Sequence, residues 1–279
     1  MKERTLLILV AMSFFTFGMA QPFSEQSDKP WKLSLQAFSL RAYSLEETLA
    51  KMDSLGLKYI EIYPGQWLDS DKTQRVNHRL DESQRNRMKA WFKQYGITPV
   101  AYGVVYPEAR AEWDTVFNFA ADLGIKMIVT EPHMDDVPII DSLCQVYGIR
   151  AALHNHALPN SFWHPATAES LLNGRSSMIG ICADVGHWVR SDIDVISWLA
   201  RLDDRVIGIH LKDLNQSREK QAHDVPWGTG VCDIAGILRQ LNQQSFSGYV
   251  TIEYNYRPED NLDEIAESIA YYQRVLSRM

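Results

Sequence analysis

The stretch VIGIHLKD at residues 206–213 is a short apolar run that leads into a histidine, a lysine and an aspartate. Runs of this kind recur along the chain, and their recurrence indicates the fold. Seven other short apolar or β-rich runs start at residues 33, 59, 98, 127, 150, 179 and 249. Successive starts are 23 to 43 residues apart, which is the spacing of strand–helix units. Helical patterns separate them, and residues 44–56 begin with a Ser-x-x-Glu capping box and end at Gly56. Eight strands that alternate with helices predict a parallel sheet.

The length and the turns favour a closed barrel over an open sheet. The chain has 279 residues, and a (β/α)8 barrel typically needs about 250. No glycine-rich GxGxxG turn of the dinucleotide-binding kind follows any of the eight runs. We therefore predict one α/β domain, a single (β/α)8 TIM barrel, at residues 31–279, after a linker at residues 21–30. Its longest strand-to-helix connections, residues 66–81 and 215–230, are predicted lids because barrel active sites lie on that side.

The first twenty residues have the organisation of a secretory signal. Lys2 and Arg4 precede an apolar run, and Gly18 and Ala20 are small residues at the positions that a signal peptidase requires. We predict a signal peptide at residues 1–20 and export to the periplasm or the medium, so that no stable membrane span remains after cleavage. A transmembrane anchor is the alternative, because the apolar run borders on spanning length.

The charge and the cysteines restrict the partners. Cleavage would take away one net positive charge and lower the formal net charge from −7 to −8. Such a balance disfavours nucleic acid, because phosphate contacts require a basic surface. Three cysteines are too few, and odd in number, for a disulfide framework. The sequence carries no signal for the oligomeric state.

Four metal-binding residue types close apolar runs. They are Glu131, Asp184, His210 and Glu253. The carboxyl ends of different barrel strands converge on one pocket, so residues about 120 positions apart can coordinate the same ion. The arrangement predicts a metal site at this end of the barrel.

Alternation along a strand adds polar neighbours to this pocket. Residues i and i+2 share one face of a strand, which pairs His154 with His156 and His210 with Lys212. His187 follows its strand in the segment ADVGH, where Gly186 would let the chain turn back toward the pocket.

Five ordered motifs carry a resemblance to a known family. They are LHNH, ADVGH, HLKD, WGTGVCDI and IEYN, which begin at residues 153, 183, 210, 227 and 252. In this order and spacing they resemble the xylose-isomerase-like barrel superfamily, which includes sugar phosphate isomerases and epimerases, ketose 3-epimerases, inosose dehydratases and endonuclease IV. The resemblance covers nearly the whole chain after residue 30 and is densest from Glu131 onward.

The resemblance implies roles for particular residues. One divalent ion would bind Glu131, Asp184, His210 and Glu253. Three carboxylates and one imidazole favour Mn²⁺, Mg²⁺ or Co²⁺, with Zn²⁺ also possible.

Four further residues would contact the substrate. His187 would contact a substrate oxygen, and His154 and His156 would line the pocket or orient the metal ligands. Lys212 would stabilise an enolate oxygen, with an ion pair to Asp213 or to a nearby carboxylate as the alternative.

These residue types predict enolate chemistry on a sugar or polyol. A divalent ion that polarises a carbonyl acidifies the adjacent C–H. Glu131 or Glu253 would then remove the proton and the other would return it, which gives an epimerase or an isomerase through an enediolate. If a β-oxygen leaves instead, the enzyme is a lyase or dehydratase of a keto-sugar or 3-keto-glycoside. A non-catalytic sugar-binding barrel is the alternative from another class.

Other features bear on the kind of ligand. The histidines that endonuclease IV carries at its second and third strands are missing, and Tyr63 and Tyr102 lie in those regions, which disfavours a trinuclear zinc site for DNA repair. The glycine turn at residues 228–230 would either hold an anion through its N–H groups or lead into a helix from Asp233. Three tryptophans would either form a sugar-stacking wall or fill the barrel mouth: Trp163, Trp188 and Trp227.

Overall fold

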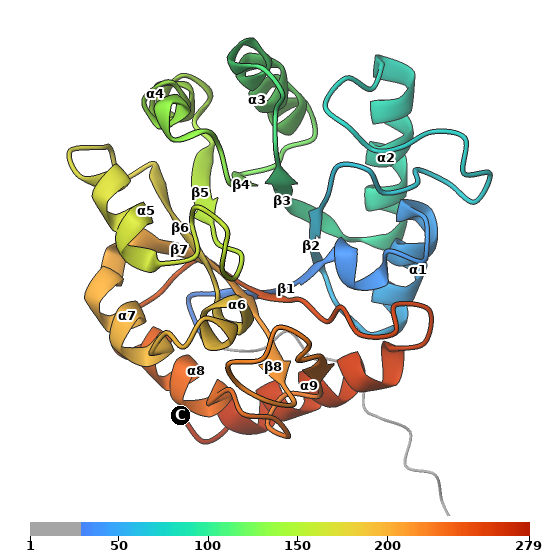
Figure 1. The fold of residues 1–279 in the computed structure, drawn as a ribbon. Helices are drawn as coiled ribbons and strands as arrows, with labels where there is room; N and C mark the ends of the chain where they lie inside the picture. Colours follow the sequence, from blue (N-terminus) through green and yellow to red (C-terminus); the bar gives the residue numbers. More distant parts are fainter. Residues whose placement is uncertain (1–28) are drawn as a thin grey trace, which may run out of the picture.

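Eight parallel strands close into a barrel in the computed structural model, which describes residues 29–279 (Figure 1). The strand order around the barrel is β1-β10-β7-β6-β5-β4-β3-β2. The strands are β1 (Lys32–Gln36), β2 (Tyr59–Ile62), β3 (Thr98–Val105), β4 (Met127–Thr130), β5 (Arg150–His154), β6 (Ile179–Asp184), β7 (Val206–Leu211) and β10 (Tyr249–Ile252). All eight predicted strands are present, so the predicted (β/α)8 barrel is confirmed. The predicted signal peptide lies outside the described residues.

Helices surround the barrel and connect its strands (Figure 1). They are α1 (Leu45–Ser54), α2 (Glu82–Tyr95), α3 (Trp113–Asp122), α4 (Val137–Tyr147), α5 (Pro165–Leu172), α6 (Val185–Arg190), α7 (Val195–Leu202), α8 (Ile234–Gln243) and α9 (Leu262–Leu276). The capping box at the start of α1 forms as predicted, because the Ser44 hydroxyl accepts from the Glu47 N–H and the Glu47 carboxylate accepts from the Ser44 N–H. None of the helices within residues 29–279 has the length and apolar character needed to cross a bilayer.

Two apolar clusters determine where a polar pocket can form. The larger one packs the helices against the outside of the barrel. The smaller one includes Val129, Ala152 and Cys182. Ala152 and Cys182 each precede an inward-facing polar residue, His154 or Asp184, by two positions, so they lie on the same side of their strands. Apolar side chains therefore fill much of the lower barrel, beside the hydrogen-bonded pair of Ser34 and Thr251, and the charged residues gather at its carboxyl end.

The connection after β7 is held by a carboxylate rather than open to an anion. Residues 213–214 form β8 (Asp213–Leu214), which pairs antiparallel with β9 (Asp224–Val225). The Asp213 carboxylate accepts from the N–H groups of Gly228 at 2.8 Å, Gly230 at 3.0 Å and Cys232 at 2.9 Å. The chain then enters α8 with Asp233 as its N-cap. The glycine turn thus leads into a helix from Asp233, as the second of its two predicted roles requires, and its N–H groups bind a carboxylate of the protein itself.

Candidate active site

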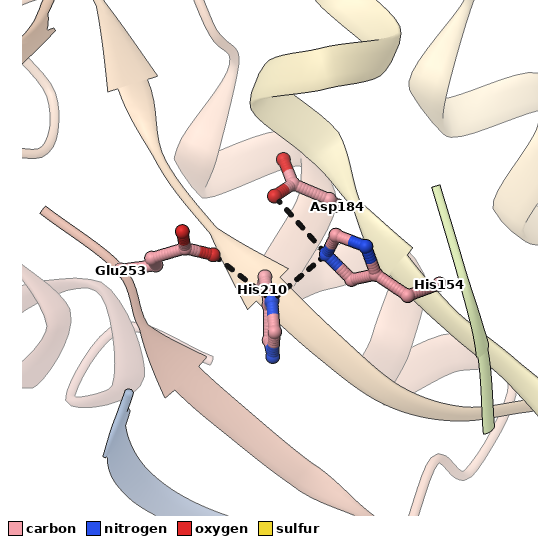
Figure 2. A group of neighbouring side chains, drawn as sticks. All are labelled: His154, Asp184, His210 and Glu253. Atoms are coloured by element: carbon pink, nitrogen blue, oxygen red, sulfur yellow. Dashed lines mark hydrogen bonds and ion pairs between the residues drawn. The ribbon is translucent and has the colours of Figure 1, made fainter. Parts of the chain in front are cut away.

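Four side chains from neighbouring strands meet at the carboxyl end of the barrel (Figure 2). His154 ends β5, Asp184 ends β6, His210 lies in β7, and Glu253 follows β10. Each offers one ligand atom, and these atoms all lie within 4.8 Å of one another. We call these four residues the central cluster. All four are buried, so their polar atoms have to find partners within the protein.

His210 is oriented by a buried carboxylate behind it. Its Nδ1 lies 2.9 Å from Glu253 Oε2 and 3.1 Å from His154 Nε2, while its Nε2 lies 3.0 Å from Glu61 Oε2. Glu61 lies in β2 and accepts a hydrogen bond from the Gln36 amide at 2.8 Å. The contact between Nε2 and Glu61 fixes the ring so that Nδ1 is directed at the central cluster. Sequence analysis missed Glu61, although an acidic residue between two isoleucines in a strand was a usable signal.

Glu131 lies beside the central cluster rather than within it. Its Oε1 lies 2.8 Å from His154 Nδ1 and also contacts His156 Nδ1, and its Oε2 accepts from the Asn160 amide at 2.6 Å. Burial would raise its pKa, but the hydrogen bonds from both imidazoles lower the pKa of Glu131 to about 2. The structure therefore brings three of the four predicted ligands together with His154, and places Glu131 behind the imidazoles in an adjoining group.

Lys212 is fully buried between two carboxylates. Its Nζ lies 2.6 Å from Asp184 Oδ2 and 3.1 Å from Glu253 Oε1, which is the ion-pair alternative for this residue. Asp213 faces the β7–α8 connection instead. Burial alone would lower the pKa of Lys212, but the two carboxylates outweigh it and raise that pKa. Burial would likewise raise the pKa of Glu253, and Lys212 with His210 lowers it.

His187 reaches the site from the first turn of α6. The Asp184 Oδ1 caps this helix by accepting from the His187 N–H at 3.0 Å. Burial lowers the pKa of His187 well below its ordinary value, although Asp184 opposes the shift, so the ring is neutral. The expected turn at Gly186 was wrong: this residue is helical, and a Cβ there would lie 2.9 Å from Lys212 Cβ and Cδ. Glycine allows Lys212 to pass close to the helix.

Gly186→Ala should therefore disturb Lys212. The added methyl group has no space beside Lys212 Cβ, and overpacking of this kind typically destabilises a protein by about 1–3 kcal/mol. We expect a lower free energy of unfolding in urea together with reduced activity. An unfolding curve that overlays that of the wild type would show that the packing around Lys212 is looser than the structure indicates.

A cavity of about 470 Å³ opens directly above the central cluster. Its lining combines imidazoles and other polar groups with aromatic side chains, which we call the aromatic wall. The lining residues are Gln36, Phe38, Tyr63, Pro64, Gly103, Val104, Tyr106, His154, His156, His187, Glu253 and Asn255. Neither predicted lid, at residues 66–81 or 215–230, contributes to this lining.

The aromatic wall is built from residues that sequence analysis did not select for this role. Trp188 and Trp227 are buried in the core, and Trp163 packs edge-on against His164. Of the two tyrosines that were noted, Tyr63 lines the cavity, whereas Tyr102 is buried against Phe119. The wall instead consists of Phe38, Tyr63 and Tyr106, from the connections after β1, β2 and β3.

The charges around the central cluster suit a divalent cation. Four carboxylates lie in or against it, and they face the Lys212 ammonium and two imidazoles, His154 and His210, whose pKa values the neighbouring carboxylates raise against the effect of burial. Buried negative charge is unfavourable unless it is paired or binds a metal, so an excess of carboxylates is a physical reason for a bound cation. Two imidazole nitrogens and two carboxylates at one point are also a common ligand set for transition metals. The residues present therefore fit a metal ion.

Comparison with known proteins agrees with the fold. The sequence profile of the xylose isomerase-like TIM barrel family matches residues 49–275. An inosose dehydratase of Lactiplantibacillus plantarum is 25% identical over 127 residues, which cover 40% of this chain and 42% of that protein. The chain thus spans less than half the length of this curated relative.

Solved structures extend the similarity over most of the barrel. An uncharacterized protein from Parabacteroides distasonis ATCC 8503 is 32% identical, with a TM-score of 0.71 over 88% of this chain and 99% of that one. The IOLI protein, whose structure holds a zinc atom, has a TM-score of 0.71 at 19% identity over 88% of this chain and 98% of its own. The protein belongs to the xylose isomerase-like TIM barrel family.

Proposed function

We propose that this protein is a metal-dependent sugar isomerase or epimerase that acts through an enediolate of a sugar or polyol. The observation that carries the proposal is the central cluster, which pairs two imidazoles with two carboxylates below a cavity of about 470 Å³. Perturbed acidic and basic groups that converge under a concave pocket are typical of active sites. The family supplies the expectation that the ligand is a sugar.

One divalent ion would be held by the central cluster, that is by His154, Asp184, His210 and Glu253. Glu131, the remaining ligand that the sequence predicts, would join them only if His156 and Asn160 released its oxygens. The nitrogen-rich set favours Zn²⁺, Mn²⁺ or Co²⁺ over Mg²⁺, which prefers oxygen ligands. When bound, the ion would act as a Lewis acid that polarises the substrate carbonyl.

Proton transfer is assigned to two residues that line the cavity, Glu253 and His156. Glu253 lines the cavity and is kept ionised by Lys212, so its carboxylate can accept a proton from a substrate carbon. His156 also lines the cavity, and its Nδ1 contacts Glu131. Glu131 would therefore act through His156, which can return the proton to the other face of the substrate. Lys212, which does not line the cavity, would position Asp184 and Glu253.

A lyase or dehydratase is the second candidate, and the relatives named inosose dehydratase favour it. The first step is the same removal of a proton next to a carbonyl. The outcomes differ only in whether a proton returns to carbon or a β-oxygen leaves.

NMR in D₂O separates these functions. The metal content of the purified protein is measured first, and ketoses and keto-glycosides are then incubated with the loaded enzyme. Deuterium that enters a carbon-bound position of a product with the formula of its substrate supports an isomerase or epimerase. Loss of water or of an aglycone supports the lyase. Binding with no exchange in any sugar would contradict both and leave a sugar-binding barrel.

Replacing Glu61 with Gln tests how His210 is held. The substitution keeps the size of the side chain but removes the charge that orients the imidazole, and such supporting partners typically contribute about 10–100-fold to metal affinity. We expect a loss of that size in a metal titration, with little change in fold. Glu169→Gln on α5, where Glu169 pairs with Arg201 on the surface, is the matched control. If Glu61→Gln bound the metal as tightly as the wild type, Glu61 would not support the metal site.

We also propose that the protein is exported, on the sequence of residues 1–20 alone. The mature chain is expected to begin near Gln21. N-terminal sequencing of protein recovered from outside the cytoplasm tests this, and recovery of Met1 would count against cleavage.

A further inference from the structure

We propose that the cavity takes an uncharged glycoside, a sugar that carries an apolar ring as its substituent and no phosphate. The inference rests on the proposed function only for the placement of the reacting sugar ring. Four features of the described residues carry it: the charge of the lining, the occupied phosphate positions, the exposed aromatic wall and the size of the cavity.

The cavity lining contains no lysine or arginine. Among the described residues, three cationic side chains close to it are already engaged. Lys212 is paired with Asp184 and Glu253, Arg41 donates to the Asn255 carbonyl at 2.9 Å, and Arg190 donates to the Ala222 carbonyl at 3.0 Å. Phosphate recognition normally relies on arginine, lysine or free backbone N–H groups. The Glu253 carboxylate in the lining would instead repel a phosphorylated ligand.

The usual phosphate position of a barrel is also filled by the protein itself. In TIM barrels a phosphate often binds the connections after strands seven and eight together with a helix N-terminus. Here the N–H groups of Gly228 and Gly230 donate to the Asp213 carboxylate. The first turn of α8 is capped by Asp233, which accepts from the Gly236 N–H at 2.8 Å. Two carboxylates thus hold the N–H groups that the connection after the seventh barrel strand would offer to a phosphate.

The aromatic wall contributes exposed ring surface to the cavity. Phe38 is 39% exposed and Tyr106 is 54% exposed, which is unusual for side chains of this size. Phe38 packs edge-on against Tyr63, with ring centroids 5.2 Å apart. An apolar ring of a ligand would cover these faces and gain both buried area and aromatic contacts.

The cavity has room for more than a sugar ring. About 470 Å³ lies within the 300–1,000 Å³ range of pockets for drug-sized ligands. The imidazoles and Glu253 offer hydrogen bonds to sugar hydroxyls, whereas Phe38 and the ring faces of Tyr63 and Tyr106 offer apolar surface. The Tyr106 hydroxyl lies close enough to Glu131 and Glu253 for their charges to raise its pKa, after burial as the larger cause. We therefore orient the sugar over the central cluster and its apolar substituent against the aromatic wall.

Calorimetric titration of the metal-loaded full chain tests the ligand class with four probes: glucose, glucose 6-phosphate, methyl β-glucoside and phenyl β-glucoside. We expect the phenyl glycoside to bind about tenfold more tightly than the methyl glycoside, which corresponds to the aromatic contacts and area gained. Glucose 6-phosphate should bind more weakly than glucose. Equal binding of the two glycosides, no binding of either, or tighter binding of the phosphate would each overturn the proposal.

Variants assign the preference to the aromatic wall. Phe38→Ala and Tyr106→Ala should bring the phenyl-to-methyl affinity ratio close to one. Tyr256→Ala is the matched control, because Tyr256 is an exposed aromatic that stacks on His223 and does not line the cavity. An unchanged ratio in both wall variants would overturn the assignment.

The two proposals fail in different ways. A phenyl preference without proton exchange would contradict the proposed reaction and leave the ligand class standing. Proton exchange in a simple ketose without any preference for the phenyl glycoside would support the proposed reaction and contradict the proposed ligand class.

Discussion

Glu253→Gln is expected to lower turnover by about 10²–10⁴-fold, which is the usual contribution of a general acid–base group. Glutamine keeps the shape of the side chain and one oxygen that can face His210, but it cannot accept a proton from the substrate. Glu253 lines the cavity, so the loss should fall on turnover while much of the substrate affinity remains. Glu131→Gln should show a loss of similar order if Glu131 acts through His156.

Loss of metal could imitate this effect, so metal content is measured on the same samples. Glu264→Gln is the matched control, since Glu264 pairs with Arg257 on the surface of α9. A Glu253→Gln protein with a full complement of metal and near-normal turnover would contradict the assignment. The base would then have to be sought at His156 or His187, which also line the cavity.

The barrel could be predicted because its signals are local. Each strand is a short apolar run, and several helices carry their own start and stop, as α1 does with Ser44 and Gly56. The convergence of Asp184, His210 and Glu253 could also be predicted, because barrel geometry brings strand ends together whatever lies between them.

The detailed site could not be predicted, because it depends on directions that the sequence does not contain. Whether Glu131 or His154 turns toward His210 is decided by hydrogen bonds to His156 and Asn160, which are made in the folded barrel. Glu61 is about 150 positions from His210, and only ring closure of the sheet brings the two together.

The aromatic wall could not be predicted from the sequence either. Side-chain size directed attention to tryptophans, but Trp188 lies on the inner side of α6 and is fully buried. Exposure at the cavity depends on the path of the connections after β1 and β3, which leaves Phe38 and Tyr106 uncovered.

His210→Ala is expected to abolish measurable metal binding and activity together. The substitution removes the Nδ1 atom that lies between Glu253 and His154, and it also leaves Glu61 without its imidazole partner. Loss of a ligand should weaken metal binding by more than the 10–100-fold typical of a supporting residue. Breaking a buried pair on one side commonly destabilises a protein by about 3–5 kcal/mol, so the midpoint of urea unfolding should fall as well.

A second substitution separates the two effects of His210→Ala. Adding Glu61→Gln neutralises the unpaired buried carboxylate, so the double variant should recover part of the lost unfolding free energy. It should recover no metal, because the Nδ1 ligand is still absent. If the double variant regained metal along with stability, the loss in His210→Ala would have come from misfolding, and His210 would not be a ligand. If stability returned without metal, His210 would be a metal ligand in its own right, and the loss of metal would not be a consequence of misfolding.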